Sequence, residues 1–290
     1  MLKRNLLVIG TIGLFILLFF EIYSLTTLIA ADQKTISSSQ SFKQDKVAET
    51  SQRTVSSSKE TEKSEQSVPS SETQVLEPKQ NTTQSQNPTD KSVAISFDDG
   101  PGATTTPQLL QILKEKKVHA TFFVLGEKAA QHPEIVKQAA KEGHEIGNHT
   151  FNHQDLTRLS TQAIMDEVTK TDNEIEKATG KKATFIRPPY GSITKVGAEI
   201  IQRPIIQWSV DSEDWRTRNT ESIIQKIQTT VYDGSIILFH DIYHETINAI
   251  PKVIDYLKEQ GYRITTVGDL LGHPTAVENY YGRNDRQAYQ

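Results

Sequence analysis

The sequence changes from apolar to acidic at Ser96-Phe97-Asp98-Asp99-Gly100, where an apolar run ends in two adjacent carboxylates and a glycine. Successive residues of a β-strand point to opposite faces of the sheet. If Asp98 and Asp99 both reach one site, the backbone must already turn there, and Gly100-Pro101-Gly102 permits such a turn. Taken alone, the stretch is equally consistent with an Asx turn that carries two solvated acids.

Short apolar runs alternate with longer segments of helical period between Lys91 and about Gly272. This alternation predicts an α/β domain with parallel strands. The candidate strands are residues 93–97, 120–125, 144–147, 184–186, 205–210, 235–239 and 263–267. The periodicity does not distinguish a short closed barrel from an open, doubly wound sheet.

Three of the intervening segments have an apolar face at helical spacing. Three glycines stand shortly before candidate strands, where helix C-caps are expected. The apolar faces are Ile164, Val168, Ile175 and Ala178; Ile223, Ile224, Ile227 and Val231; and Ile247, Ile250, Val253, Ile254 and Leu257, and the glycines are Gly143, Gly180 and Gly261.

The bulk composition excludes three classes of protein. With 290 residues, a formal net charge of −4 and no cysteine, the chain is neither a nucleic-acid binder by bulk charge, nor a disulfide scaffold, nor a cysteine-ligated metal protein. We therefore expect no nucleic-acid partner. We also expect the folded domain to be a monomer.

The amino-terminal part predicts a membrane segment followed by a linker. Lys3 and Arg4 precede an apolar stretch, residues 6–25, that is long enough to cross the hydrocarbon core. We expect residues 1–31 to be an uncleaved anchor, with a signal peptide cut near Ala30 or Ala31 as the alternative. Residues 32–90 are polar and lack apolar periodicity, which predicts a disordered tether. The domain then covers residues 91–272, and residues 273–290 form a C-terminal tail.

Polar side chains follow the carboxyl ends of five of the candidate strands. In barrels and open α/β sheets alike, this edge holds the active site. The residues are Asp98 with Asp99, His149 with His153, Arg187, Asp214 with Trp215, and His240.

Two of these residues, His149 and His153, stand four positions apart, which brings their imidazoles together on a helical turn or a curled loop. With Asp99 they make a set of two histidines and one acid that suits a transition metal. Zinc is the first expectation, with cobalt, nickel, iron or manganese as alternatives. We expect the remaining histidines to be surface or packing residues: His119, His132, His144, His244 and His273.

Three protein ligands leave a coordination position for water, whose pKa a metal can lower from about 15.7 to about 7. Asp98 stands beside Asp99 and is the candidate general base for that water. His240 can donate a proton, and acids within residues 211–215 and 238–241 could hold it as imidazolium.

The remaining candidates are an arginine with the turn that follows it, and two apolar residues that would line a small pocket. Arg187 precedes a turn fixed by two prolines, so its guanidinium can hold a carboxylate while the turn presents the backbone N–H of Tyr190. Trp215 and Leu238 would supply an apolar wall. A structural ion pair, a plain turn and ordinary core residues are the alternatives for these positions. Neither a Gly-rich phosphate motif nor a Gly-x-Ser-x-Gly elbow is present.

The order of these motifs resembles the polysaccharide deacetylases of carbohydrate esterase family 4, which carry the NodB homology domain. The resemblance covers Lys91 to about Leu271, through residues 96–100, 149–153, 187–190, 211–215 and 238–240. Ser96 replaces the threonine usual in the family, and we expect this change to touch no catalytic atom.

The resemblance implies a distorted (β/α) barrel of about seven parallel strands with a divalent metal, usually zinc, on Asp99, His149 and His153. It implies that Asp98 is the base and His240 the acid. The other roles that it implies are a tether for the base at Arg187, a carboxylate that tunes the acid at Asp214, an oxyanion donor at the Tyr190 amide, and an acetyl pocket at Trp215 and Leu238.

The expected activity is therefore removal of N-acetyl groups from N-acetylglucosamine of a cell-wall polysaccharide. Peptidoglycan is favoured, because the anchor and tether place the domain outside the membrane, facing the wall. N-acetylmuramic acid, chitin-type oligomers, poly-N-acetylglucosamine and acetylated xylan remain open as substrates. A carbohydrate-binding module without turnover is the alternative from another class.

Overall fold

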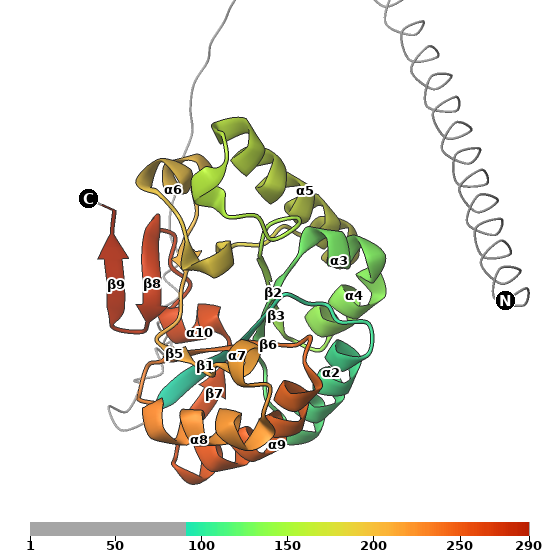
Figure 1. Ribbon diagram of the computed structural model, residues 1–290, viewed down its shortest axis with the longest axis vertical. Helices are drawn as coiled ribbons and strands as arrows, with labels where there is room; N and C mark the ends of the chain where they lie inside the picture. Colours follow the sequence, from blue (N-terminus) through green and yellow to red (C-terminus); the bar gives the residue numbers. More distant parts are fainter. Residues whose placement is uncertain (1–90, 290) are drawn as a thin grey trace, which may run out of the picture. The chain divides into compact units, whose positions relative to one another are not determined.

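The computed structural model describes residues 91–289 of the chain (Figure 1). The candidate anchor and the predicted linker lie outside these residues. Within the described part, no helix is both long and apolar enough to cross a membrane. The fold below is that of the predicted α/β domain and the segment that follows it.

The domain is built on a parallel sheet with β1 (Ser92–Asp98) near its centre. The strand order is β3-β2-β1-β6-β5, and β7 pairs with the first residues of β1. The predicted parallel α/β architecture is therefore confirmed. The other strands of this sheet are β2 (Thr121–Val124), β3 (Glu145–Asn148), β5 (Val210–Asp211), β6 (Ile236–His240) and β7 (Arg263–Thr265).

Helices surround this sheet in Figure 1. The three predicted apolar faces are buried on α5, α8 and α9, except that Val231 lies just beyond the end of α8 and is only partly buried. The helices are α2 (Thr105–Lys116), α3 (Gly126–Gln131), α4 (Pro133–Lys141), α5 (Thr161–Thr179), α6 (Lys195–Ile201), α7 (Asp214–Thr217), α8 (Thr220–Thr230), α9 (His244–Glu259) and α10 (Val267–Leu271), with 3₁₀ turns η2 (Leu156–Arg158) and η3 (Pro189–Gly191).

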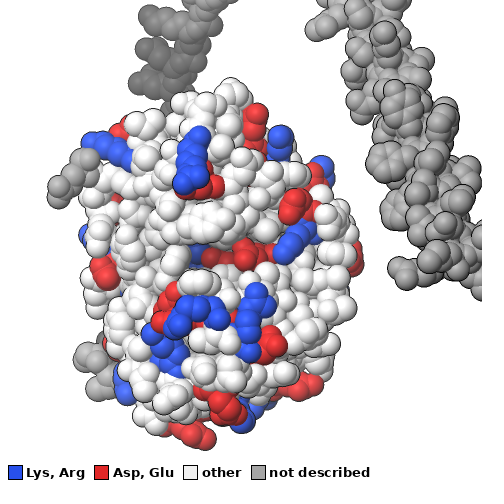
Figure 2. Space-filling model, in the orientation of Figure 1, with Lys and Arg blue, Asp and Glu red and all other residues white. Residues whose placement is uncertain are grey.

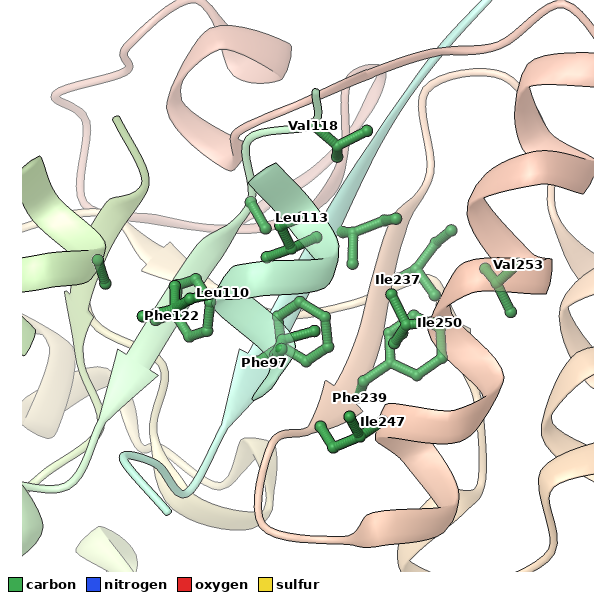
Figure 3. Packing of buried hydrophobic residues seen from close by; sticks show 14 of the residues in the cluster. Phe97, Leu110, Leu113, Val118, Phe122, Ile237, Phe239, Ile247, Ile250 and Val253 are labelled. Carbon is green, nitrogen blue, oxygen red and sulfur yellow. The ribbon is translucent and has the colours of Figure 1, made fainter. Parts of the chain in front are cut away.

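The two faces of β1 have different roles. Phe97 packs on Phe122 of β2 and Phe239 of β6, with ring centroids 5.3 and 5.7 Å apart, in the main core beneath α2 and α9 (Figure 3). The alternate residues Ser96 and Asp98 point to the opposite face, where they contact Arg187. One face therefore stabilises the domain through apolar burial, while the other carries buried polar groups.

Two predicted strands differ from the structure. Residues 184–186 form only isolated bridges, through which Ile186 pairs with Asn148 and Ile205. Residues 205–210 divide into β4 (Ile205–Ile206) and β5. The run divides because its two parts pair with different strands. β4 pairs with the strand Glu278–Gly282, where the Gln207 N–H also donates to the Tyr280 carbonyl, whereas β5 pairs with β6.

The segment after Gly272, which the sequence left without a fold, forms a β-hairpin. Its strands are β8 (Glu278–Gly282) and β9 (Asp285–Ala288), and β8 pairs in parallel with β4. Tyr280 is buried in a second apolar cluster with Phe185 and Ile206. The tail is therefore part of the folded unit.

Candidate active site

A cavity of about 390 Å³ opens at the carboxyl ends of β1 and β6. All of the predicted site residues line it except Arg187 and Asp214, which lie behind it and are hydrogen-bonded to Asp98 and His240. Figure 2 shows acidic side chains gathered across the middle of the viewed face, with Lys and Arg side chains beside them. The lining residues are Asp98, Asp99, His149, His153, Pro188, Tyr190, Trp208, Asp211, Trp215, Leu238, His240 and Tyr243.

The chain turns at Asp99, as the sequence predicted. Asp98 ends β1, and Asp99 has a left-handed φ of 69°, which directs both carboxylates into the same cavity. Gly100 is required next, because a Cβ there would lie 2.4 Å from the carboxylate oxygens of Asp241. Asp241 itself accepts a hydrogen bond from the Thr106 hydroxyl.

Asp99, His149 and His153 form a cluster whose ligand atoms all lie within 4.8 Å of one another. Asp99 Oδ1 is 3.5 Å from His149 Nε2 and 3.4 Å from His153 Nε2. This oxygen is buried and has no hydrogen-bond partner in the described part of the chain. A buried oxygen left without a donor, between two imidazole nitrogens, fits a bound cation.

The tautomer of His149 agrees with metal binding. Its Nδ1 is 2.6 Å from the carbonyl oxygen of Arg187, which can only accept, so Nδ1 carries the proton and donates it. Nε2 then presents its lone pair to Asp99 and His153, as in metal-binding histidines oriented by a backbone carbonyl. His153 reaches the cluster because the loop curls at Thr150 and His153, both with positive φ.

Asp99 and His149 shift each other's protonation. Burial by itself raises the pKa of Asp99, but the nearby His149, together with His240 and His153, outweighs burial and lowers that pKa. Burial likewise opposes the charged form of His149, whereas Asp98 and Asp99 raise its pKa above the usual value. The cluster therefore stabilises a positive charge beside an ionised carboxylate.

Asp98 is held by a buried arginine. Arg187 is fully buried, and its Nη1 donates to Asp98 Oδ1 at 2.7 Å and to the Ser96 hydroxyl at 2.9 Å. Ser96 in turn donates to the carbonyl of Ile237. The Ser96 hydroxyl thus orients the guanidinium, and a threonine would carry the same hydroxyl, so the expectation that the change from threonine to serine touches no catalytic atom stays a prediction. The second oxygen of Asp98 is free of Arg187 and lies 3.7 Å from His149 Nε2.

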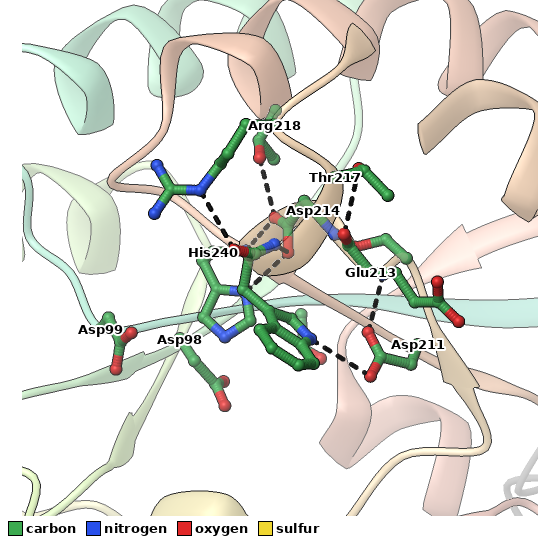
Figure 4. Close-up of polar contacts among 12 residues, drawn as sticks. Asp98, Asp99, Asp211, Glu213, Asp214, Thr217, Arg218 and His240 are labelled. Carbon is green, nitrogen blue, oxygen red and sulfur yellow. Dashed lines mark hydrogen bonds and ion pairs between the residues drawn. The ribbon is translucent and has the colours of Figure 1, made fainter. Parts of the chain in front are cut away.

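His240 is oriented by Asp214 (Figure 4). Its Nδ1 lies 2.7 Å from Asp214 Oδ1, and its backbone N–H donates to Asp214 Oδ2, also at 2.7 Å. Asp214 is fully buried and also accepts hydrogen bonds from the Thr246 hydroxyl and the Trp215 N–H. Because the carboxylate accepts from Nδ1–H, Nε2 is the ring atom left to exchange a proton in the cavity.

The same pair sets the charge of His240. Burial lowers its pKa, but the hydrogen bond and the charge of Asp214, with smaller contributions from Asp98 and Asp99, raise the pKa to about 9. At neutral pH the imidazole is therefore protonated, which is the state that a proton donor needs. In parallel strand register, Asp98 and His240 are direct neighbours, so a proton acceptor and a proton donor face one cavity.

We expect Asp214→Asn to shift the pH profile of catalysis to lower pH. Without the carboxylate, burial prevails and the pKa of His240 falls from about 9 toward or below 6.5, so the donor loses its proton at lower pH. The alkaline limb of kcat/KM, measured between pH 6 and 10, checks this. An unchanged limb in a folded variant would mean that another group is the donor.

Two aromatic residues of the cavity wall were not predicted from the sequence. Trp208 and Tyr243 line the cavity together with the predicted Tyr190 and Trp215. The exposed fraction is 68% for Tyr190 and 50% for Trp215. Trp208 lay hidden inside a run predicted as a single strand, and Tyr243 follows His240 by three residues without a motif of its own. Leu238 is buried and lies deeper in the wall. Exposed aromatic rings around an acidic cavity can pack on the faces of sugar rings.

Comparison with known proteins agrees with this geometry. Residues 85–203 match the polysaccharide deacetylase family. The chain is 41% identical over 198 residues to the peptidoglycan-N-acetylglucosamine deacetylase PgdA of Listeria monocytogenes, covering 68% of this chain and 42% of that protein. It is 41% identical over 193 residues to the peptidoglycan-N-acetylmuramic acid deacetylase PdaC of Bacillus subtilis, covering 67% of this chain and 41% of that protein.

A solved structure described as T48 deacetylase with substrate superposes with a TM-score of 0.64 at 40% identity, covering 66% of this chain and 97% of that one. The fold and the cavity thus define an α/β protein with an acid–histidine site at the ends of parallel strands. The chain belongs to the polysaccharide deacetylase family. It spans about two fifths of the length of the two curated relatives named above.

Proposed function

We propose that this protein is a metal-dependent hydrolase that removes N-acetyl groups from N-acetylglucosamine of peptidoglycan. One observation carries the proposal: the Arg187-bound Asp98 and the Asp214-bound His240 line the same cavity as the Asp99, His149 and His153 cluster. A proton acceptor, a proton donor and a cation site in one cavity are what hydrolysis of an amide requires. The strand order and the bridges of Ile186 to β3 and β4 also fit the distorted barrel that the family resemblance implies.

Asp99, His149 and His153 would hold the cation, for which we propose zinc. When bound, the cation would supply Lewis acidity to the acetamide carbonyl and lower the pKa of water. The chain supports this site through residues that touch no substrate. His149 is fixed by the Arg187 carbonyl, and the ammonium group of Lys128 donates to the Asp99 carbonyl at 2.9 Å.

Asp98 accepts the proton of the attacking water through its second oxygen, while Arg187 holds the first one in place. The oxygen of that water forms a bond to the carbonyl carbon, and the carbonyl oxygen becomes negatively charged. The backbone N–H of Tyr190 is the proposed donor to that oxygen, where the chain turns with a φ of 61°.

His240 then delivers its Nε2 proton to the amide nitrogen as the carbon–nitrogen bond breaks. Acetic acid and a free amino sugar leave, and the acid ionises to acetate in water. Transfer of the Asp98 proton to His240 through solvent returns both groups to their starting charge. Asp214 stabilises the imidazolium before transfer and keeps the ring oriented afterwards. Leu238 and Trp215 would surround the acetyl methyl group.

The substrate follows from the relatives and from the amino-terminal sequence. Both named relatives act on peptidoglycan by name, one on N-acetylglucosamine and the other on N-acetylmuramic acid. We propose that residues 1–31 anchor the chain, because Lys3 and Arg4 precede an apolar stretch of membrane-spanning length. The catalytic domain would then face the cell wall.

Acetate release tests the proposal. The full chain, loaded with zinc, is expected to release acetate from purified peptidoglycan, and a chelator should abolish the release until zinc is restored. Mass spectrometry of the digested wall identifies which sugar lost its acetyl group. Release from chitin-type oligomers or acetylated xylan alone would replace peptidoglycan as the substrate. A chain that binds zinc and glycan but releases no acetate would be a binding module instead.

A further inference from the structure

Arg218 stands beside the cavity in a fixed position. The central carbon of its guanidinium lies 3.2 Å from the centre of the Tyr243 ring, and Tyr243 lines the cavity. Its Nε donates to the Trp215 carbonyl at 3.2 Å, an interaction drawn in Figure 4. Stacking on an aromatic ring and a backbone hydrogen bond together restrict the side chain without neutralising its charge.

Arg218 lacks an acidic partner, unlike the other arginines near the site. Arg187 is paired with Asp98, Arg158 with Asp155, and Arg216 with Glu213. Among residues 91–289, no carboxylate lies within ion-pair distance of Arg218, and its two terminal nitrogens have no acceptor. An exposed, oriented guanidinium with free donors is suited to bidentate binding of an external anion.

The aspartates of the cavity oppose binding of an anionic ligand, and the positive charge of Arg218 would favour it. Asp98, Asp99 and Asp211 line the cavity, so a negatively charged group on a bound polymer would be repelled by the carboxylates of these three residues. Arg218 reaches the wall on the Tyr243 side and offers the opposite charge there. A substrate with an anionic substituent would therefore bind with that substituent directed toward Tyr243.

We propose that Arg218 binds a carboxylate of the polysaccharide substrate and so selects charged glycans over neutral ones. The inference rests on the proposed function and narrows its substrate. In peptidoglycan two kinds of carboxylate have the required chemistry: the lactyl carboxylate of muramic acid where no stem peptide is attached, and the carboxylates of the stem peptide. Arg218 is thus a specificity residue, separate from the residues that transfer protons.

The test compares three ligands with wild-type chain, Arg218→Gln and Arg218→Lys. The ligands are a neutral N-acetylglucosamine oligomer, a glycan with free lactyl carboxylates, and the same glycan with amide-linked stem peptides. Calorimetric binding constants are measured first, because they need no turnover, and kcat/KM for acetate release second. Arg216→Gln is the matched control, since Arg216 is exposed and already paired with Glu213.

We expect Arg218→Gln to lower the preference for one charged ligand over the neutral oligomer by about 3- to 10-fold, in binding and in kcat/KM. Arg218→Lys should keep part of it, and Arg216→Gln all of it. The charged ligand for which the protein loses its preference shows whether Arg218 binds the lactyl or the peptide carboxylate. An unchanged preference in Arg218→Gln, or an equal loss for all three ligands, overturns the inference. Absence of acetate release with an intact binding preference contradicts only the proposed function.

Discussion

Asp98→Asn is expected to lower kcat by about 10²- to 10⁴-fold, the usual contribution of a general base. The amide oxygen of asparagine can still accept from Arg187, so the buried interaction at 2.7 Å is largely kept. The amide group, however, cannot take a proton from water. Because Asp98 is not part of the Asp99, His149 and His153 cluster, the zinc content should be unchanged.

The measurement is single-substrate kinetics on peptidoglycan fragments, with zinc content determined by elemental analysis of the same preparation. Asp255→Asn is the control, because Asp255 is an exposed residue of α9 that pairs with Lys116. It should leave kcat and zinc content at wild-type values. Near-native turnover by zinc-loaded Asp98→Asn would show that another group accepts the proton.

The position of the site was predictable because it depends on strand ends. In a parallel sheet the carboxyl ends of neighbouring strands lie along one edge. The polar residues that follow the apolar runs therefore gather at that edge. Asp98 and His240, the last residues of β1 and β6, pair in register at this edge. The turn at Gly100 and the proximity of His149 and His153 were also predictable, because each depends only on a few consecutive residues.

The hydrogen-bond and packing partners of these residues could not be predicted from the sequence, because they depend on packing between segments far apart in it. Ser96 and Arg187 are separated by 91 positions, and no spacing in the sequence joins the serine hydroxyl to the guanidinium. Tyr243 becomes part of the cavity only through the turn that precedes α9. The hairpin of β8 and β9 depends on β4, a strand of two residues that carries almost no periodic signal.

Arg187→Met is expected to lower the free energy of unfolding by about 3 to 5 kcal/mol, because it removes one partner of a buried ion pair. Arg187 and Asp98 are 0% and 3% exposed. The guanidinium also donates to the carbonyls of Ile206 and Gln207 and stacks on the Phe123 ring. Methionine fills part of the volume but leaves the Asp98 carboxylate and these carbonyls without donors.

Urea unfolding of four proteins separates the charge from the packing: wild type, Arg187→Met, Asp98→Asn and the double variant. The double variant should be more stable than the sum of the single effects implies, because a neutral asparagine needs no counter-charge. Arg216→Met, which removes an exposed arginine, should change stability little. A loss in Arg187→Met that matches this control, with no coupling to Asp98, would mean that the buried pair orients the base without stabilising the fold.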